Sequence, residues 1–144
     1  MNWLSQEYIK SEASKGLEAA LLCSIKHWDQ ICSAKEVDCR SIDAGILLST
    51  SCCALCQKYH DLPRGCYSAC VVGKYSNVGC GDGSLFVKAH DAYWDWDVVS
   101  STREHYKYFK RFKYHARNML NFLKKIYAAE FRGIGVCPKN YVIK

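Results

Sequence analysis

The sequence has little of what marks disordered, low-complexity or membrane-spanning chains. Only two of its 144 residues are proline, and no tract rich in Gly/Ser, Gln/Asn or Pro interrupts it, which excludes a low-complexity protein. The stretch poorest in charge, 41–57, still contains Asp43 together with Ser, Thr and Cys. That stretch is too polar to cross a bilayer core about 30 Å thick, so no membrane-spanning helix is predicted.

The N-terminus also lacks the pattern of a secretory signal. Its first residues, MNWLSQEY, contain no basic run followed by an apolar core, so a cytoplasmic protein is expected. Cysteine is nevertheless abundant, with ten residues. In a reducing compartment these are expected to be metal ligands and buried thiols, whereas in a processed secreted protein they would indicate a disulfide framework.

What is present indicates one folded domain over residues 1–144. Hydrophobic residues make up 49% of the chain and aromatic residues 13%, which is enough for a hydrophobic core. The expected fold class is mostly α, formally α+β, with helices packed around a small zinc-stabilised loop or hairpin module.

Residues 101–132 predict the longest helix. Ser101 and Glu104 have the spacing of a capping box, and Gly133 begins a Gly- and Pro-containing stop. Apolar residues recur at three- and four-residue spacing and form one stripe: Phe109, Phe112, Ala116, Met119, Leu120, Leu123, Ile126 and Tyr127.

The N-terminal part, residues 1–40, is also predicted to be helical. Gly16 is expected to separate a short helix at 4–10 from a longer helix capped by Ser14. One face of the longer helix carries Leu17, Ala20, Leu21, Ser24, Ile25, Trp28 and Ile31.

Residues 50–90 have a different character, because five glycines and Pro63 argue against a long helix. The apolar runs at 70–72 and 85–87 have the length of strands. Such a region buries little apolar surface, so we expect it to be held together by its cysteines.

Those cysteines have the spacing of a structural zinc site. Two thiolates in a Cys-x-x-Cys motif can reach one Zn²⁺, and a second pair completes a tetrahedron. The predicted ligands are Cys53, Cys56, Cys66 and Cys70, with Cys80 as the alternative fourth ligand and Cys52, His60 and His90 close enough to substitute. A disulfide cluster and unliganded buried thiols stay open as alternatives. The remaining cysteines, Cys23, Cys32, Cys39 and Cys137, are expected to be ordinary thiols.

These motifs resemble a loose group of small bacteriophage proteins, without an established activity, that carry a central Cys-Ala-Leu-Cys zinc-binding module. The resemblance rests on a Trp-containing helix at 27–31, on Cys53-Ala54-Leu55-Cys56 and on a second cysteine pair followed by Gly79-Cys80 and a closing helix. In that group the second pair is usually Cys-x-x-Cys-Pro, whereas this chain has one residue more and no proline. The resemblance implies a phage-encoded protein that acts in the host cytoplasm.

The positive charge is concentrated in the predicted C-terminal helix. Residues 101–132 hold nine basic and two acidic side chains, while residues 1–100 hold nine basic and twelve acidic ones. A surface of this kind suits a phosphate backbone or an acidic patch on a protein, although a charged helix face is often only solvated. The predicted partner-binding residues are Lys107, Lys110, Arg111, Tyr114, Arg117, Lys124 and Lys125.

No constellation of catalytic residues is evident. The sequence contains no His-x-Glu or His-Glu-x-x-His motif, and the loop at 79–84 lacks the Lys-Ser/Thr ending of a P-loop. The aromatic run at 93–97 predicts core packing, with a partner-binding hot spot as the alternative.

These observations predict a small zinc-binding interaction protein rather than an enzyme. Its basic helix is expected to bind and modulate a host protein or nucleoprotein complex. Direct nucleic-acid binding by the same helix is the alternative, and a metal-dependent nuclease using His60 or His90 is a weaker one.

Overall fold

The computed structural model describes residues 1–43, 47–48, 53–59 and 70–133. Within these ranges it contains seven helices and no strand. The helices are α1 (Gln6–Ser14), α2 (Leu17–Ser33), α3 (Glu36–Arg40), α5 (Ala54–Tyr59), α7 (Val71–Tyr75), α8 (Leu85–Val99) and α9 (His105–Phe131). The prediction of a mostly helical fold is confirmed.

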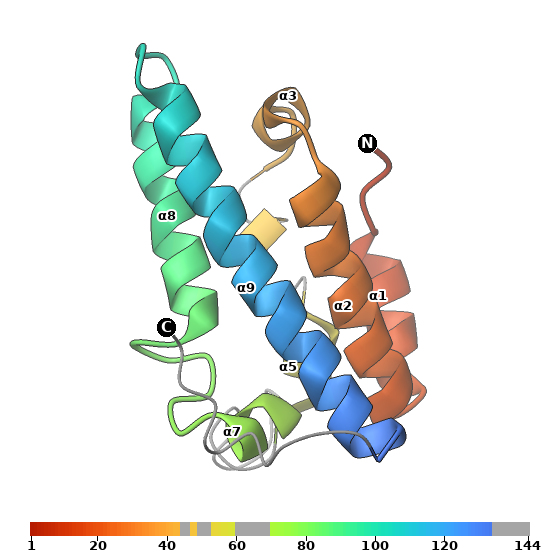
Figure 1. Cartoon of the computed structure of the whole chain (residues 1–144). Helices are drawn as coiled ribbons and strands as arrows, with labels where there is room; N and C mark the ends of the chain where they lie inside the picture. Colours follow the sequence, from red (N-terminus) through yellow and green to blue (C-terminus); the bar gives the residue numbers. More distant parts are fainter. Residues whose placement is uncertain (44–46, 49–52, 60–69, 134–144) are drawn as a thin grey trace.

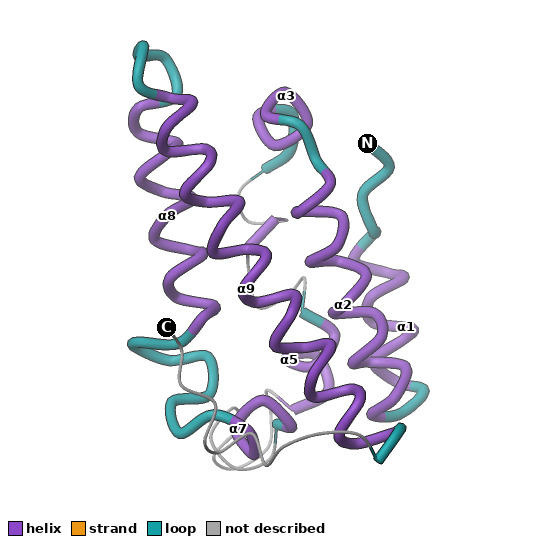
Figure 2. The backbone as a smooth tube through the Cα atoms, in the orientation of Figure 1, coloured by secondary structure: helices purple, strands orange, loops and turns teal. Residues whose placement is uncertain are grey.

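The long helix α9 is central to the fold. It packs against α8 on one side and against α2 on the other, and α2 packs in turn against α1 (Figure 1). The short helix α5 packs against α1 and α2, and α7 contacts α9. The tube in Figure 2 shows α8 and α9 as antiparallel neighbours joined by a short loop. One face of α9 is therefore covered along its length.

The covered face of α9 is the predicted apolar stripe. Phe112, Ala116 and Ile126 have no exposed surface, and the rest of the stripe is buried except for the half-buried Tyr127. Phe122 is buried as well, which was not predicted. Each large apolar side chain removed from water contributes about 1.5 to 3 kcal/mol. This burial fixes which face of α9 remains available to solvent.

Gly16 separates α1 from α2, as the sequence predicts. Its φ of 128° lies in the region that favours glycine. The predicted cap is wrong, because Gly16 itself is the N-cap of α2 and Ser14 is the last residue of α1. The Ser14 hydroxyl donates to the Ser11 carbonyl instead.

The two predicted strands are wrong. Residues 70–72 lead into α7 and residues 85–87 begin α8. The Ser84 hydroxyl accepts the Val87 N–H at 3.1 Å and caps α8, which satisfies a donor that a helix start leaves unpaired. From Leu85 onward the buried residues follow a helical period, because Leu85, Ala89, Ala92, Tyr93 and Trp96 lie on one face. Residues 50–52 and 60–69 of the predicted loop or hairpin module (50–90) lie outside the described residues.

The predicted capping box at Ser101 is also wrong, and α9 begins four residues later. Residues 100–104 form the connection between α8 and α9, where the Thr102 N–H donates to the Val99 carbonyl at 2.9 Å. Glu104 is the N-cap and makes no side-chain cap hydrogen bond. The chain therefore reverses direction at the position where the sequence pattern predicts a helix start.

Candidate functional site

The outer side of α9 carries the predicted partner-binding residues. We call this surface the basic face and define it as Lys107, Lys110, Arg111, Tyr114, Arg117, Lys124 and Lys125, all of which are exposed. They project outward because the apolar stripe holds the opposite side of the helix against α8 and α2. Helical spacing of three and four residues places successive members one above the other.

The cations on the basic face differ in their ion pairing within the described part of the chain. Arg111 has its guanidinium 3.7 Å from a carboxylate oxygen of Asp95 on α8. Among the residues described, Lys107, Arg117 and Lys124 form no ion pair. Their charge is therefore available to a partner.

Two exposed tyrosines lie among these cations. Tyr114 is 59% exposed, and Tyr106, which the sequence reasoning missed, is 58% exposed. The Lys110 ammonium lies over the Tyr106 ring, 4.8 Å from its centroid. The signal that could have found Tyr106 is its position one helical turn before Lys110. Flat aromatic surface beside cations suits the stacking of bases or of partner aromatic groups.

Lys113 belongs to the same charge cluster in sequence but has a different place in the structure. Its ammonium donates to the carbonyl oxygens of Ile31 and Ala34, the second at 2.7 Å. These carbonyls lie at the C-terminal end of α2, where helix acceptors lack intrahelical partners. Burial lowers the pKa of Lys113 below its ordinary value. This lysine is a structural cap.

A hydrogen-bonded cluster around Glu36 holds the start of α9 in place. One Glu36 carboxylate oxygen accepts from the Trp96 indole at 2.8 Å, from His105 Nδ1 at 2.7 Å and from Arg40 at 2.9 Å. Arg40 also donates to the Ser100 carbonyl. Although burial raises the pKa of Glu36, the hydrogen bonds from Trp96 and His105 outweigh it and lower that pKa. The cluster joins α3, α8 and α9 and so fixes the orientation of the basic face.

The aromatic run on α8 is divided between core and surface. Tyr93 and Trp96 are buried and pack edge-on against each other, with ring centroids 5.5 Å apart. Trp94 is 44% exposed, and its indole donates to His90 Nε2 at 3.0 Å. The run is helical, so residues three apart share a face.

Of the predicted metal ligands, Cys53 and Cys56 lie together at the start of α5. Cys53 is partly exposed and Cys56 is buried. The Ser24 hydroxyl and the Cys53 thiol form a hydrogen bond at 3.8 Å in which either group can be the donor. The thiol and the backbone N–H of Cys56 also hydrogen-bond to the Cys53 sulfur. These hydrogen bonds, that of the Cys56 thiol above all, outweigh the effect of burial and lower the pKa of Cys53 below the ordinary thiol value.

The other predicted ligands do not complete a metal site within the described residues. Cys70 is buried directly before α7, and Cys80 is half-buried in the turn before α8. In the part of the chain that the structure describes, no three His, Cys, Asp or Glu residues gather as metal ligands. Cys66, Cys52 and His60 lie outside it, so the zinc site stays a prediction.

Of the thiols expected to be ordinary, Cys23 and Cys39 are buried and Cys32 is half-buried. Burial raises the pKa of Cys23 and Cys39 to about 11 and also raises that of Cys32. Such thiols stay protonated at neutral pH and react slowly. Cys137 lies outside the described residues.

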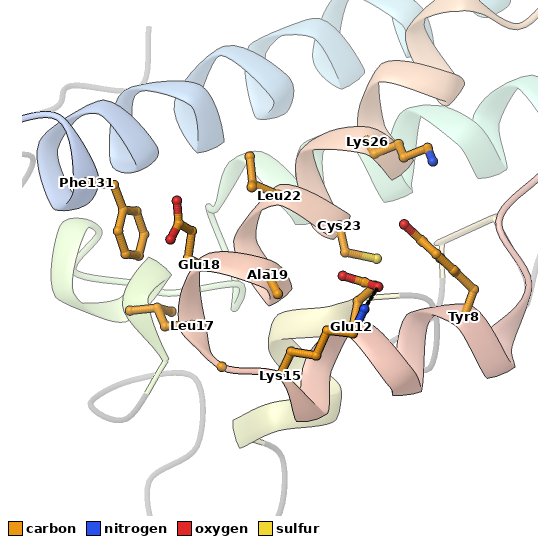
Figure 3. A pocket seen from close by; sticks show the side chains of 11 residues that line it. Tyr8, Glu12, Lys15, Leu17, Glu18, Ala19, Leu22, Cys23, Lys26 and Phe131 are labelled. Atoms are coloured by element: carbon orange, nitrogen blue, oxygen red, sulfur yellow. Dashed lines mark hydrogen bonds and ion pairs between the residues drawn. The ribbon is translucent and has the colours of Figure 1, made fainter.

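A surface groove that the sequence did not predict lies between α1, α2 and the end of α9 (Figure 3). Its volume is about 640 Å³, and its lining includes Tyr8, Leu22 and Phe131. Lys15 and Glu12, which both line the groove, form an ion pair with each other at 2.6 Å. The lining residues come from three separate elements, so no local sequence pattern marks the groove.

Comparison of the chain with protein families, curated proteins and solved structures found no match. The resemblance to small bacteriophage proteins therefore stays a prediction. No helix in the described ranges combines the length and apolar character that a membrane span requires.

Proposed function

We propose that this chain is a binding protein that docks the basic face of α9 on an acidic macromolecular surface. The observation that carries the proposal is the row of exposed cations on α9, of which Lys107, Arg117 and Lys124 make no ion pair with a described residue. A cation that forms no ion pair within the protein can interact with an anionic group of a partner molecule. The rigid helix holds these charges at fixed spacing, which lowers the entropy lost on binding.

The phosphate backbone of a nucleic acid, free or in a host nucleoprotein complex, fits this face most directly. Residues 107–125 extend over about 27 Å at the helical rise of 1.5 Å per residue, so several phosphates can be contacted at once. Because α8 and α2 flank α9, the helix forms a strip on the surface and cannot enter a groove alone. We therefore expect backbone contacts with little base reading.

An acidic patch on a host protein is the second candidate. It is favoured by Trp94 and Val98, which are 44% and 78% exposed on α8. The Asp95–Arg111 pair links this part of α8 to the basic face, and exposed aromatic residues are enriched in protein interfaces. The implied phage origin would make the partner a host protein whose activity the chain modulates.

The predicted zinc has a structural part in this proposal. Hydrogen-bond donors around Cys53 favour a thiolate, which is the form that binds zinc. Cys53 and Cys56 would supply two ligands, and Cys66 with Cys70 or Cys80 the others. A zinc held in this way would stabilise the region between α3 and α8. No reaction is part of the proposal.

The proposal is tested by binding of fluorescently labelled duplex DNA and RNA, measured by anisotropy. A face variant, K107Q/K110Q/R117Q, is compared with a control variant, K10Q/K15Q/K26Q, whose three lysines are exposed on α1, α2 and the turn between them. Both variants lose the same charge. The face variant is expected to bind at least about 10-fold more weakly than the control. Equal loss in the two variants would contradict docking through α9.

The second candidate is separated from the first by affinity capture from host lysate with and without nuclease treatment. A protein partner is expected to be captured in both samples by the control variant and lost with the face variant. Capture that disappears after nuclease treatment favours the nucleic acid.

A further inference from the structure

The exposed side of α9 contains a row in which aromatic and cationic side chains alternate. Tyr106, Lys110 and Tyr114 follow one another at four-residue spacing, which makes them neighbours on the surface of the helix. The two tyrosines are 58% and 59% exposed, and Lys110 is exposed as well. The tyrosines lie about 12 Å apart along the axis, at 1.5 Å per residue. A ligand on this row therefore meets two separate aromatic surfaces with a cation between them.

These two tyrosines differ from the other tyrosines of α9. Tyr108 is half-buried and packs against the hydrophobic core. Tyr127 donates its hydroxyl hydrogen to a Glu18 carboxylate oxygen at 2.9 Å. Within the described part of the chain, the hydroxyls of Tyr106 and Tyr114 form no hydrogen bond. Neither core packing nor an internal hydrogen bond to a described residue accounts for these two rings.

Local contacts nevertheless orient both rings. The Lys110 ammonium lies over the Tyr106 ring, 4.8 Å from its centroid. The Tyr114 ring meets the ring of the half-buried His115 edge to face, with centroids 5.2 Å apart. Side chains that are held in this way lose less conformational entropy when a ligand stacks on them.

This arrangement favours a single strand over a duplex as the ligand. In a duplex the bases stack on one another, and a helix flanked by α8 and α2 reaches mainly phosphates and sugars. In a single strand the bases are accessible, so they can stack on aromatic side chains while cations contact the backbone. The rings of Tyr106 and Tyr114 can therefore contribute fully only with a single strand.

We propose that the row formed by Tyr106, Lys110 and Tyr114 binds single-stranded nucleic acid, with one base stacked on each tyrosine and the backbone held by Lys110 and the neighbouring cations. The inference rests on the proposed function, because it names the partner of the basic face. It adds that the aromatic rings select the form of nucleic acid. Every base has a flat face, so little sequence preference is expected.

The first test compares three fluorescent ligands of equal length by anisotropy at physiological salt. They are an oligodeoxythymidine, an abasic strand that carries the same phosphates without bases, and a duplex. The wild type is expected to bind the oligodeoxythymidine at least about 5-fold more tightly than the abasic strand, and also more tightly than the duplex. Equal affinity for the oligodeoxythymidine and the abasic strand would overturn the proposal, because the bases would then contribute nothing.

Variants assign the effect to the two rings. Y106L/Y114L removes both rings and no charge, and it is expected to bind the oligodeoxythymidine at least about 10-fold more weakly and to lose most of the preference over the abasic strand. Y106F/Y114F keeps the rings and should keep that preference. The matched control is Y8L, because Tyr8 on α1 is 40% exposed and has the Lys26 ammonium 5.2 Å from its ring centroid. Equal losses in Y106L/Y114L and Y8L would contradict the assignment.

Failure of this proposal can be distinguished from failure of the proposed function. If the face variant and the control variant defined above bind all three ligands equally, docking through α9 is wrong and this proposal is wrong with it. If only the face variant loses binding, but the wild type binds the oligodeoxythymidine and the abasic strand equally, the basic face is a phosphate-binding surface. Only the selection by the aromatic rings is then overturned.

Discussion

Lys110 and Lys113 lie three residues apart on α9 and have opposite roles. Lys110 is exposed over the Tyr106 ring, whereas Lys113 donates to two carbonyls at the end of α2. Sequence spacing alone could not separate them, because the distinction depends on where α2 ends. A count of positive charges therefore overstates the number of cations available to a partner.

This difference gives a prediction at the residue scale. Lys113→Met leaves the Ile31 and Ala34 carbonyls without their charged donor and is expected to destabilise the fold by about 1 to 3 kcal/mol. Lys110→Met is expected to change stability by less than about 0.5 kcal/mol but to weaken partner binding. Urea denaturation and nucleic-acid binding of both variants give the comparison. Equal stability losses in the two would show that Lys113 is not a cap.

Glu36 gives a pH-dependent prediction. Its folded-state pKa is lowered, so its stabilising contribution is present above the ordinary glutamate pKa of about 4.3 and is lost as pH falls through the folded value. Glu36→Gln should therefore be less stable than wild type at pH 7 by about 1 kcal/mol, with the difference shrinking in acid. Thermal unfolding between pH 3 and pH 7 measures this, and a constant difference across that range would contradict it.

Glu36 also shows why part of the site could not be predicted. Its partners Trp96 and His105 are 60 and 69 residues away in sequence. Nothing local marks a glutamate in a five-residue helix as the residue that orients α9. Only the packing of α3 against the α8–α9 connection brings these groups together.

At the scale of elements, α9 is the helix that the sequence predicts best. Its apolar period persists from Phe109 to Ile126, so each turn of this stretch indicates the same buried face. The sequence pattern places the start of α9 too early, because Ser101 and Glu104 match a capping box whereas the tight α8–α9 turn makes Glu104 the N-cap. The same period indicates which residues of α9 face outward. It does not show whether those residues bind a partner.

Helix α8 was harder to predict. The run at 85–87 is short enough for a strand, and the alternating aromatic and acidic residues at 93–97 match a period of two. The helix is favoured by the Ser84 cap and by burial of Tyr93 and Trp96 on one face. Here the helix cap and tertiary burial outweigh the local sequence pattern.

The two faces of α9 predict separable effects of mutation. Phe112 has no exposed surface and contacts the Tyr93 ring with centroids 5.4 Å apart, so Phe112→Ala should cost about 3 to 5 kcal/mol of stability. Tyr114 is exposed, so Tyr114→Ala should leave stability within about 0.5 kcal/mol and reduce binding. Denaturant unfolding and anisotropy measured on both variants test the pair. A strong loss of stability in Tyr114→Ala would mean that the basic face is not a free surface.

At the scale of the whole molecule, the mostly helical class was predictable, but the groove between α1, α2 and α9 was not. The class follows from hydrophobic period and few helix breakers, which are properties of sequence. The groove in Figure 3 depends on how three helices meet, which no single segment encodes.

The zinc prediction also belongs to this scale, because the metal would join segments on both sides of 60–69. Protein purified under reducing conditions is expected to carry about one zinc per chain. Cys66→Ser is expected to lower both the zinc content and the stability, because a structural zinc contributes to folding. Cys32→Ser is the control. Metal analysis that finds well under one zinc per chain in the wild type would end this interpretation.

The most direct test of the central claim is the salt dependence of nucleic-acid binding. The logarithm of the binding constant is plotted against the logarithm of salt concentration for the wild type, the face variant K107Q/K110Q/R117Q and the control variant K10Q/K15Q/K26Q. Because each phosphate contact contributes about 0.9 to the slope, the face variant should lose about 2 to 3 units of slope and the control none. Parallel lines for the wild type and the face variant would contradict the account that α9 docks this protein on an acidic surface.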